Sequence, residues 1–265
     1  MALLLLHATC GCRTDAVPPT QEQRDVKSLL LAGTAATLLA FGASGALASG
    51  ITLVGGTAGQ IPGGPVSNEA LRPVAAGGLG FANPLGGYYG AQVQIAGGAY
   101  VIDFLGREAG ANNQFRYLGG NGGAAFTINS NITGTNHFDI NGIGPSYSLT
   151  LTAGLLDFRF YSPIDGGKTV VNGANPAPVV DVINFFATFQ APPGNGSAGA
   201  SSGDVLYLFL DDTGSSDWRL ADDDNHDDMV IRITFVPEPA SLALLGVGLV
   251  GLAAAARRRK AARAA

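Results

Sequence analysis

Glycine interrupts this chain at short intervals, and that spacing limits what it can fold into. The sequence has 39 Gly among 265 residues, set between short runs of β-branched and aromatic residues. Glycine weakens helix interiors and favours turns, so these runs predict short strands joined by many turns. No stretch of the central region places apolar residues at helical spacing over three turns. The sequence predicts an all-β fold, an antiparallel β-sandwich with a jelly-roll-like arrangement.

The strongest predicted strands are residues 179–190 and 204–210, which are the longest apolar runs. Residues 91–95 and 100–105 are predicted to pair with each other around a Gly-Gly turn. Residues 229–235 alternate apolar and polar side chains, which predicts an edge or half-exposed strand. Weaker strands are predicted at residues 124–129, 136–140, 147–152 and 155–161.

A secretory signal pattern occupies residues 26–48. Lys27 precedes an apolar stretch over residues 29–40, and small residues then lead to Ala46 and Ala48 in an A-x-A arrangement. A charged region, an apolar region and a small-residue site, in this order, are typical of a signal peptide. We therefore expect cleavage after Ala48.

Residues 1–25 lie ahead of this signal, and we interpret them as a mis-assigned start that is absent from the mature protein. The alternative is a lipoprotein signal that ends at Cys10 or Cys12. Neither cysteine follows the usual small and apolar box, and no basic residue precedes the first leucines. On the first interpretation the mature chain has no cysteine, which excludes disulfides and Cys-based metal sites.

The other end of the chain, residues 237–265, has three parts. Pro237, Glu238 and Pro239 come first, followed by 17 small or apolar residues over positions 240–256. At ~1.5 Å rise, such a helix spans about 25 Å, near the lower limit for crossing a bilayer. A basic cluster follows, and it predicts that the C-terminus stays in the cytoplasm and the rest of the chain outside. The sequence thus predicts one C-terminal transmembrane helix, and its basic cluster contains Arg257, Arg258, Arg259 and Lys260.

This order of Pro-Glu-Pro, apolar helix and arginine cluster resembles the PEP-CTERM sorting signal. The resemblance implies export through the Sec machinery, an inner-membrane-anchored precursor, and cleavage near the Pro-Glu-Pro by an exosortase. It also implies a final place at the cell surface or outside the cell, in bacteria that make exopolysaccharide and biofilm matrix. Pro237, Glu238 and Pro239 match the motif residue by residue, as processing residues.

Between the two ends, residues 49–84 are rich in Gly, Ala and Pro and are predicted to be an irregular lead-in. Residues 85–236 form the predicted β-sandwich domain. Residues 49–236 contain seven Lys and Arg against 16 Asp and Glu, a net charge of −9. This charge argues against a nucleic-acid partner, because phosphate binding needs clustered basic side chains.

Eight carboxylates fall within the 18 residues from Asp211 to Asp228. Carboxylates this dense repel one another, and a hard cation such as calcium relieves that repulsion. The segment is not an EF-hand, since Thr234 stands where the final glutamate would be. The alternative is a solvated turn between two strands. The candidate calcium ligands are Asp211, Asp212, Asp222, Asp223, Asp224, Asn225, Asp227 and Asp228.

Residues 207–212 and 223–233, directly before the Pro-Glu-Pro, also resemble the terminal segment of many PEP-CTERM proteins. Together with residues 106–115 they are similar to a domain of unknown function in exported bacterial proteins. This resemblance supports one β domain and implies no reaction.

The chain has no His-Glu-x-x-His pattern. Its Gly-x-Ser-x-Gly match, residues 199–203, lies in a Gly/Ser/Ala-rich segment before the predicted strand 204–210, and not between a strand and a helix as in a hydrolase. We expect a structural or interaction protein of the matrix and no enzymatic activity. One alternative is a carbohydrate-binding module for exopolysaccharide, and another is a glycan hydrolase that uses a pair such as Asp211 and Glu108. The aromatic residues considered for sugar stacking, against an ordinary place in the core, are Tyr88, Tyr89, Tyr117 and Trp218.

Overall fold

The structure of the protein is a computed structural model. It describes residues 49–61, 68–134, 137–176, 182–192, 199–212, 226–238 and 240–262. The predicted signal peptide, with Ala46 and Ala48, lies outside the described residues. The described body, residues 49–236, consists of antiparallel strands with a few short 3-10 turns, which confirms the all-β prediction.

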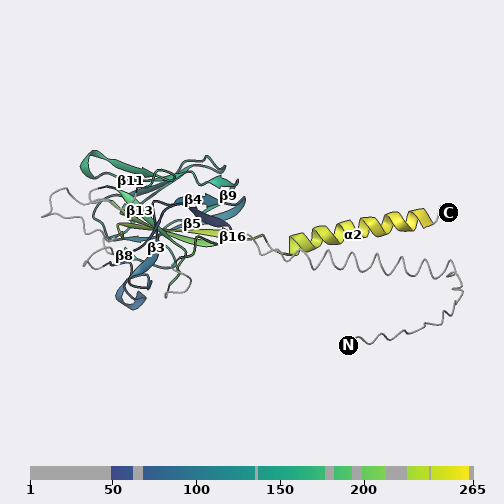
Figure 1. The fold of residues 1–265 in the computed structure, drawn as a ribbon, viewed down its shortest axis with the longest axis horizontal. Coiled ribbons are helices and arrows are strands. Elements are labelled where there is room, and N and C mark those ends of the chain that lie inside the picture. The colour runs from purple at the N-terminus through teal and green to yellow at the C-terminus, as the bar shows by residue number, and fades with distance from the viewer. Residues whose placement is uncertain are drawn as a thin grey trace, which may run out of the picture. The chain divides into compact units, whose positions relative to one another are not determined.

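Three sheets make up this body (Figure 1). The large sheet has the order β2-β3-β13-β15-β16-β5-β8, and β9 also pairs with β5. Its strands are β2 Thr57–Ile61, β3 Leu85–Tyr89, β5 Gly98–Arg107, β8 His137–Phe138, β9 Tyr147–Leu151, β13 Asn184–Thr188, β15 Val205–Asp211 and β16 Met229–Val236.

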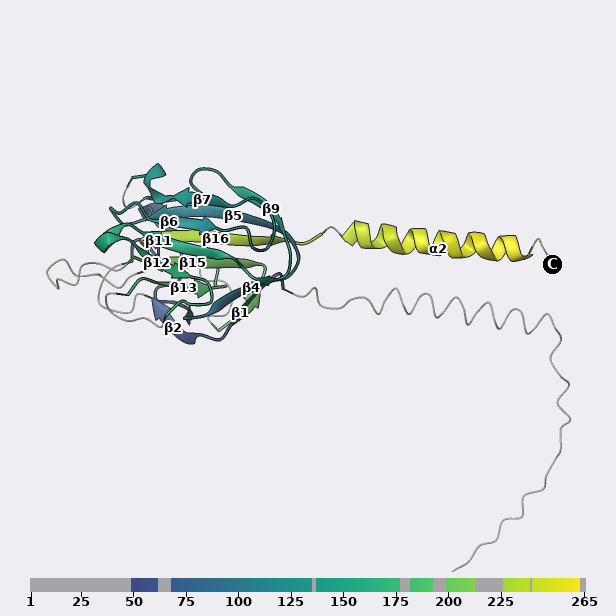
Figure 2. The ribbon, with the colours of Figure 1, turned by 90° about the horizontal axis from the view of Figure 1, so that it is seen from above.

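Two smaller sheets of four strands accompany the large one, and Figure 2 labels β1 and β4 of the first and all strands of the second. The β1 sheet has the order β10-β4-β1-β14, with β1 Ile51–Val54, β4 Gln92–Ile95, β10 Gly154–Leu155 and β14 Ser202–Gly203. The β6 sheet has the order β12-β11-β6-β7, with β6 Gln114–Tyr117, β7 Phe126–Asn129, β11 Phe158–Ser162 and β12 Lys168–Val171. The body is thus a sandwich of three sheets, whereas a jelly roll has two.

One hydrophobic core joins all three sheets. Its members include Leu208 from the large sheet, Ile51 from the β1 sheet, and Phe158 from the β6 sheet. The Phe158 ring packs against Phe185 of the large sheet at 5.5 Å between ring centres. Both small sheets therefore bury apolar side chains with the same face of the large sheet, its inner face.

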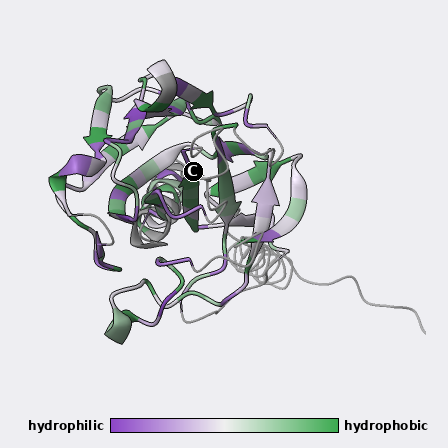
Figure 3. Cartoon of the chain, turned by 90° about the vertical axis from the view of Figure 1, so that its left-hand side faces the viewer, coloured by the Kyte–Doolittle hydropathy of each residue, from purple (hydrophilic) through white to green (hydrophobic). Residues whose placement is uncertain are grey.

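The outer face of the large sheet is also buried. Phe209 points to this side and packs with Phe81 from the segment between β2 and β3, with ring centres 5.3 Å apart. Residues 68–85, with the 3-10 turn η1 at Val74–Ala76, form this outer cover. Because both faces are dry, β15 reads Val-Leu-Tyr-Leu-Phe-Leu without alternation. The strands inside the body accordingly show the most hydrophobic colouring in Figure 3.

Two predictions about the N-terminal half of the body are wrong. Residues 49–84 are not an irregular lead-in, because β1 contributes to the main core and β2 pairs with β3. Residues 91–105 do not form a hairpin, since β4 pairs with β1 and β10, and β5 pairs with β16, β8 and β9. The chain passes from a small sheet to the large one at Gly98, whose φ of 150° suits glycine.

The prediction that β16 is an edge strand is also wrong. The strand lies between β15 and β5 in the middle of the large sheet. Its polar position Arg232 forms an ion pair with Asp103 at 2.7 Å, opposite it on β5, and donates to the Ile140 carbonyl oxygen at 2.8 Å. The polar position thus carries an ion pair within the sheet. The half-exposed part of the prediction holds for Arg232, Thr234 and Phe235, which are half-buried.

The helix predicted after the Pro-Glu-Pro is present as α2, Ala240–Ala262. Within the described part of the chain, no helix is both long enough and apolar enough to cross a membrane. The prediction of a helix is confirmed here, and the prediction of a membrane span is not.

Burial on both faces predicts that outer-face residues stabilise the fold as much as inner ones do. Replacing the fully buried Phe209 with alanine should lower the free energy of unfolding by about 3–5 kcal/mol, measured by urea denaturation. Val171→Ala is the control, because Val171 is 39% exposed on the β6 sheet, and should cost less than about 1 kcal/mol. Equal, small losses for both variants would mean that the outer face is not a core.

Candidate functional site

The candidate site lies at the end of the large sheet where β15 ends and β16 begins. Asp211 is the last residue of β15 and Asp212 follows it, while Asp227 and Asp228 directly precede β16. The two strands are antiparallel neighbours, with Leu210 opposite Met229, so the register brings these four aspartates together. The other predicted calcium ligands, Asp222, Asp223, Asp224 and Asn225, lie outside the described residues.

These four aspartates are buried. The exposed fractions of Asp211, Asp212, Asp227 and Asp228 are 2, 4, 0 and 8%, respectively. A solvated turn, the alternative considered from the sequence, would leave them open to water, so the described part of this cluster does not fit that alternative. Buried carboxylates must instead be compensated by hydrogen bonds, by opposite charge or by protonation.

Backbone and amide groups provide part of this compensation. The Asp212 N–H donates to Asp228 Oδ2 at 2.7 Å, and Asn113 Nδ2 donates to Asp212 Oδ2 at 2.6 Å. Burial, followed by the charge of Asp212 and the smaller effects of Asp211 and Asp227, raises the pKa of Asp228 well above its usual value. The carboxylates of this cluster therefore repel one another in the folded protein.

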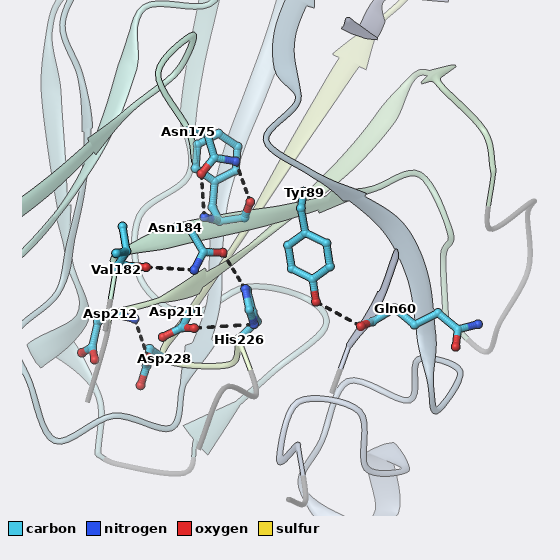
Figure 4. A network of polar contacts seen from close by, with 10 residues as sticks. Gln60, Tyr89, Asn175, Val182, Asn184, Asp211, Asp212, His226 and Asp228 are labelled. Atoms are coloured by element: carbon cyan, nitrogen blue, oxygen red, sulfur yellow. Dashed lines mark hydrogen bonds and ion pairs between the residues drawn. The ribbon is translucent and has the colours of Figure 1, made fainter. Parts of the chain in front are cut away.

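His226 links the cluster to the neighbouring strand β13 (Figure 4). Its Nε2 lies 2.7 Å from Asn184 Oδ1, and its Nδ1 lies 3.8 Å from Asp211 Oδ2. The ring packs edge-on against Tyr89, with ring centres 5.3 Å apart. His226 has a φ of 62°, in the left-handed region that histidine adopts more readily than most residues. No local pattern in the sequence signals this contact, because Asn184 is 42 residues away.

Asp227 has a structural role that sequence reasoning missed. Its Oδ2 accepts hydrogen bonds from the backbone N–H groups of Glu69 and Ala70, the latter at 3.2 Å. Its own carbonyl oxygen accepts from the Glu108 N–H at 2.9 Å. One carboxylate thus fastens the start of the outer cover to the end of the large sheet. No local pattern signals this contact, because Asp227 and Glu69 are 158 positions apart.

Glu108 and Asn113 belong to the same end of the sheet. Burial, with the nearby charges of Glu69 and Asp212, raises the pKa of Glu108. Asn113 is fully buried, and its Oδ1 has no hydrogen-bond partner among the described residues. From the sequence alone, Glu108 was a candidate partner of Asp211 in a glycan hydrolase. The structure places Glu108 within electrostatic reach of Asp212.

Two of the aromatic residues considered for sugar binding belong to the cores. Tyr89 and Tyr117 are 7 and 1% exposed. Tyr88 is half-buried, and its hydroxyl donates to the Gly199 carbonyl oxygen at 2.7 Å. Trp218 lies outside the described residues.

The described residues alone do not make a metal centre. Among them, no group of three or more His, Cys, Asp or Glu side chains has an arrangement that could hold a metal ion. The four buried aspartates at this end of the large sheet, the acidic end, connect strands and loops through their hydrogen bonds. A cation site there would require ligands beyond the described residues.

The sorting residues lie directly after β16. Pro237 and Glu238 are exposed, and Pro239 lies outside the described residues. Arg257 and Arg259 are exposed near the end of α2, where Arg258 also lies. An all-β body is thus followed by an exposed Pro-Glu sequence and a C-terminal helix with basic residues, which is the order of parts predicted for a sorting tail.

Comparison with known proteins agrees with this prediction. Residues 235–260 match the family model of the PEP-CTERM protein-sorting motif. The chain is a PEP-CTERM domain-containing protein, and the motif makes it an exported protein processed by an exosortase. Neither the curated proteins nor the solved structures gave a match to the chain.

The contacts of Asp227 predict that its carboxylate holds the outer cover in place. In metal-free buffer, Asp227→Ala should lower the free energy of unfolding by about 2–3 kcal/mol, because two backbone N–H groups lose a charged acceptor. The Ala70 amide should also exchange its hydrogen faster. Asp139→Ala is the control, since exposed Asp139 accepts only within its own turn, from Asn141. Unchanged exchange at Ala70 would contradict this role.

Proposed function

We propose that this chain is a structural or interaction protein of the bacterial cell surface or extracellular matrix and has no enzymatic activity. The Sec machinery exports it, and an exosortase then releases it from the inner membrane. The observation that carries this proposal is the place of the sorting motif, whose match begins at the end of β16. Because Pro237 and Glu238 are exposed, a protease reaches them without opening the large sheet.

In this proposal α2 holds the precursor at the membrane until cleavage. Leu249, Val250 and Leu252 are 59, 71 and 69% exposed, although they point in different directions around the helix. A helix that is apolar on several sides finds its most favourable surroundings in lipid. Arg257 and Arg259 follow the apolar residues and favour the cytoplasmic side of the bilayer.

We also propose that calcium binds at the acidic end of the large sheet. Burial and the charges of the neighbouring aspartates raise the pKa of Asp228. A divalent cation would relieve the repulsion among these carboxylates, and calcium accepts several carboxylate and amide oxygens in irregular loops. The buried Oδ1 of Asn113, next to Asp212, supplies a neutral oxygen ligand for such a cation. Calcium would then tie the strand ends together outside the cell.

A carbohydrate-binding module is the second candidate function. It is favoured by the outward face of the β6 sheet, where the Arg116 guanidinium lies over the ring of Tyr161 and Arg159 is the strand partner of Arg116. A glycan hydrolase has less support. Asp211, one member of the carboxylate pair considered for it, is 2% exposed and lies beside His226.

If an exosortase cleaves the precursor, a chain without an intact sorting motif should not be released from the membrane. In the native host, changing Pro237, Glu238 and Pro239 together to alanine should leave the uncleaved precursor in the inner-membrane fraction. Cell fractionation and immunoblotting against the β body measure this. Val236→Ala, one residue before the motif, is the matched control and should be released normally. Release of the triple variant at wild-type size and amount would contradict exosortase processing.

Calcium binding predicts a rise in the melting temperature of the full chain in detergent. At a calcium concentration 100 times the Kd, the linkage relation gives about 2.7 kcal/mol of stabilisation, or roughly 5–10 °C for a domain of this size. Asp212→Asn should remove this response, while Asp139→Asn should keep it. A wild-type melting temperature that does not change with calcium, or rises equally with magnesium, contradicts the calcium site.

A further inference from the structure

Among the described arginines of the body, two on the β6 sheet contact neither a carboxylate nor a backbone carbonyl oxygen. Arg116 and Arg159 form no ion pair with a carboxylate in the described part of the chain. The other described arginines of the body have partners: Arg72 with Glu69, Arg232 with Asp103, and Arg107 with the carbonyl oxygens of Ala111 and Thr133. In a body with a net charge of −9, two arginines with neither kind of partner require an explanation.

The register places these two arginines directly opposite each other. Arg159 on β11 is the partner of Arg116 on β6, and the two strands are antiparallel. Both side chains are half-exposed, whereas the alternate residues Phe115 and Phe160 are buried in the core, so both arginines lie on the outward face of the β6 sheet. Figure 2 shows the four strands of this sheet beside one another. Like charges directly opposite each other destabilise a strand pair.

Neighbouring side chains orient Arg116 along this face. Its Nε donates to Gln114 Oε1 at 2.7 Å, and its guanidinium carbon lies 4.4 Å from the centre of the Tyr161 ring. The Arg159 Nε is buried and has no hydrogen-bond partner among the described residues. A pocket of about 490 Å³ opens here, and its lining includes Gln114, Arg116, Phe126, Thr127 and Arg159.

We propose that this face binds the carboxylate groups of an acidic polysaccharide, such as a uronate polymer. A guanidinium group matches a carboxylate with two parallel hydrogen bonds, and a bound anion would offset the repulsion between Arg116 and Arg159. Thr127, opposite Arg116 on β7, adds a hydroxyl group suited to sugar hydroxyls. This inference rests on the second candidate function, carbohydrate binding, and names its ligand class.

The net charge of the body disfavours nucleic acid more strongly than a uronate polymer, whose carboxylates are spaced along the chain, one on each sugar. A body with a net charge of −9 repels nucleic acid and anionic membranes at long range. Salt screens that repulsion beyond about 8 Å at physiological ionic strength, whereas direct contacts with spaced carboxylates persist. The sorting motif also sends this face out of the cell, where glycans are present.

Calorimetry with the full chain in detergent tests the proposal, with polygalacturonate as the probe and dextran as the neutral comparison. Wild-type protein should bind polygalacturonate and not dextran, and the affinity should fall as sodium chloride is added. Arg116→Gln or Arg159→Gln should weaken binding about tenfold each, as expected for the loss of a charge-assisted hydrogen bond. The melting temperature of both variants should stay the same or rise, because a like-charge pair is removed.

Arg72→Gln is the matched control, since it removes the same charge from a residue that pairs with Glu69 outside the β6 sheet. It should leave the affinity unchanged. Equal binding of dextran would retain carbohydrate binding and overturn the choice of an acidic ligand, and absence of binding to either glycan would overturn both. Stronger binding to dextran sulfate or to phosphatidylglycerol vesicles than to polygalacturonate would also overturn the proposal. None of these outcomes depends on whether an exosortase processes the chain.

Discussion

The middle of the large sheet is apolar on both faces, and the rest of the body is arranged to keep water away from it. Successive residues of β15 point to opposite faces, Leu208 to the inner core and Phe209 to the outer one. Two small sheets cover the inner face, and residues 68–85 cover the outer face. The outer cover contains little regular structure, so it depends on side-chain contacts for its place. Asp227 provides one of them, through the N–H groups of Glu69 and Ala70.

This arrangement explains why carboxylates are buried at the end of the sheet. Asp211, Asp212, Asp227 and Asp228 lie where β15 and β16 meet the loops, and their oxygens accept from backbone N–H groups and from Asn113. Burial, together with the charges of the neighbouring aspartates, raises the pKa of Asp228. This cluster thus holds the strand ends and the outer cover together. In the calcium proposal, the cation strengthens the same connection outside the cell.

Much of the fold was predictable from local patterns, whereas the contacts between distant segments were not. The apolar runs at β13 and β15 and the tail with its Pro-Glu-Pro are visible in the sequence, because each is a continuous pattern. The short strands β1 and β2 are hidden among glycines, and their pairing with β4 and β3 depends on packing. The facing of Arg116 and Arg159 depends on strand register, and Asp227 contacts a segment 158 positions away. Periodicity does not encode either of these contacts.

The position of β16 connects the fold to the export signal. This strand lies in the middle of the large sheet, and its last residues lead into the sorting motif at residues 235–260. The intact mass of the protein recovered from the outside of native host cells tests this account most directly. Export and exosortase cleavage should yield a chain that starts near residue 49 and ends near the Pro-Glu-Pro, without α2. Recovery of the full-length chain, with both ends intact, from the soluble interior of the cell would contradict it.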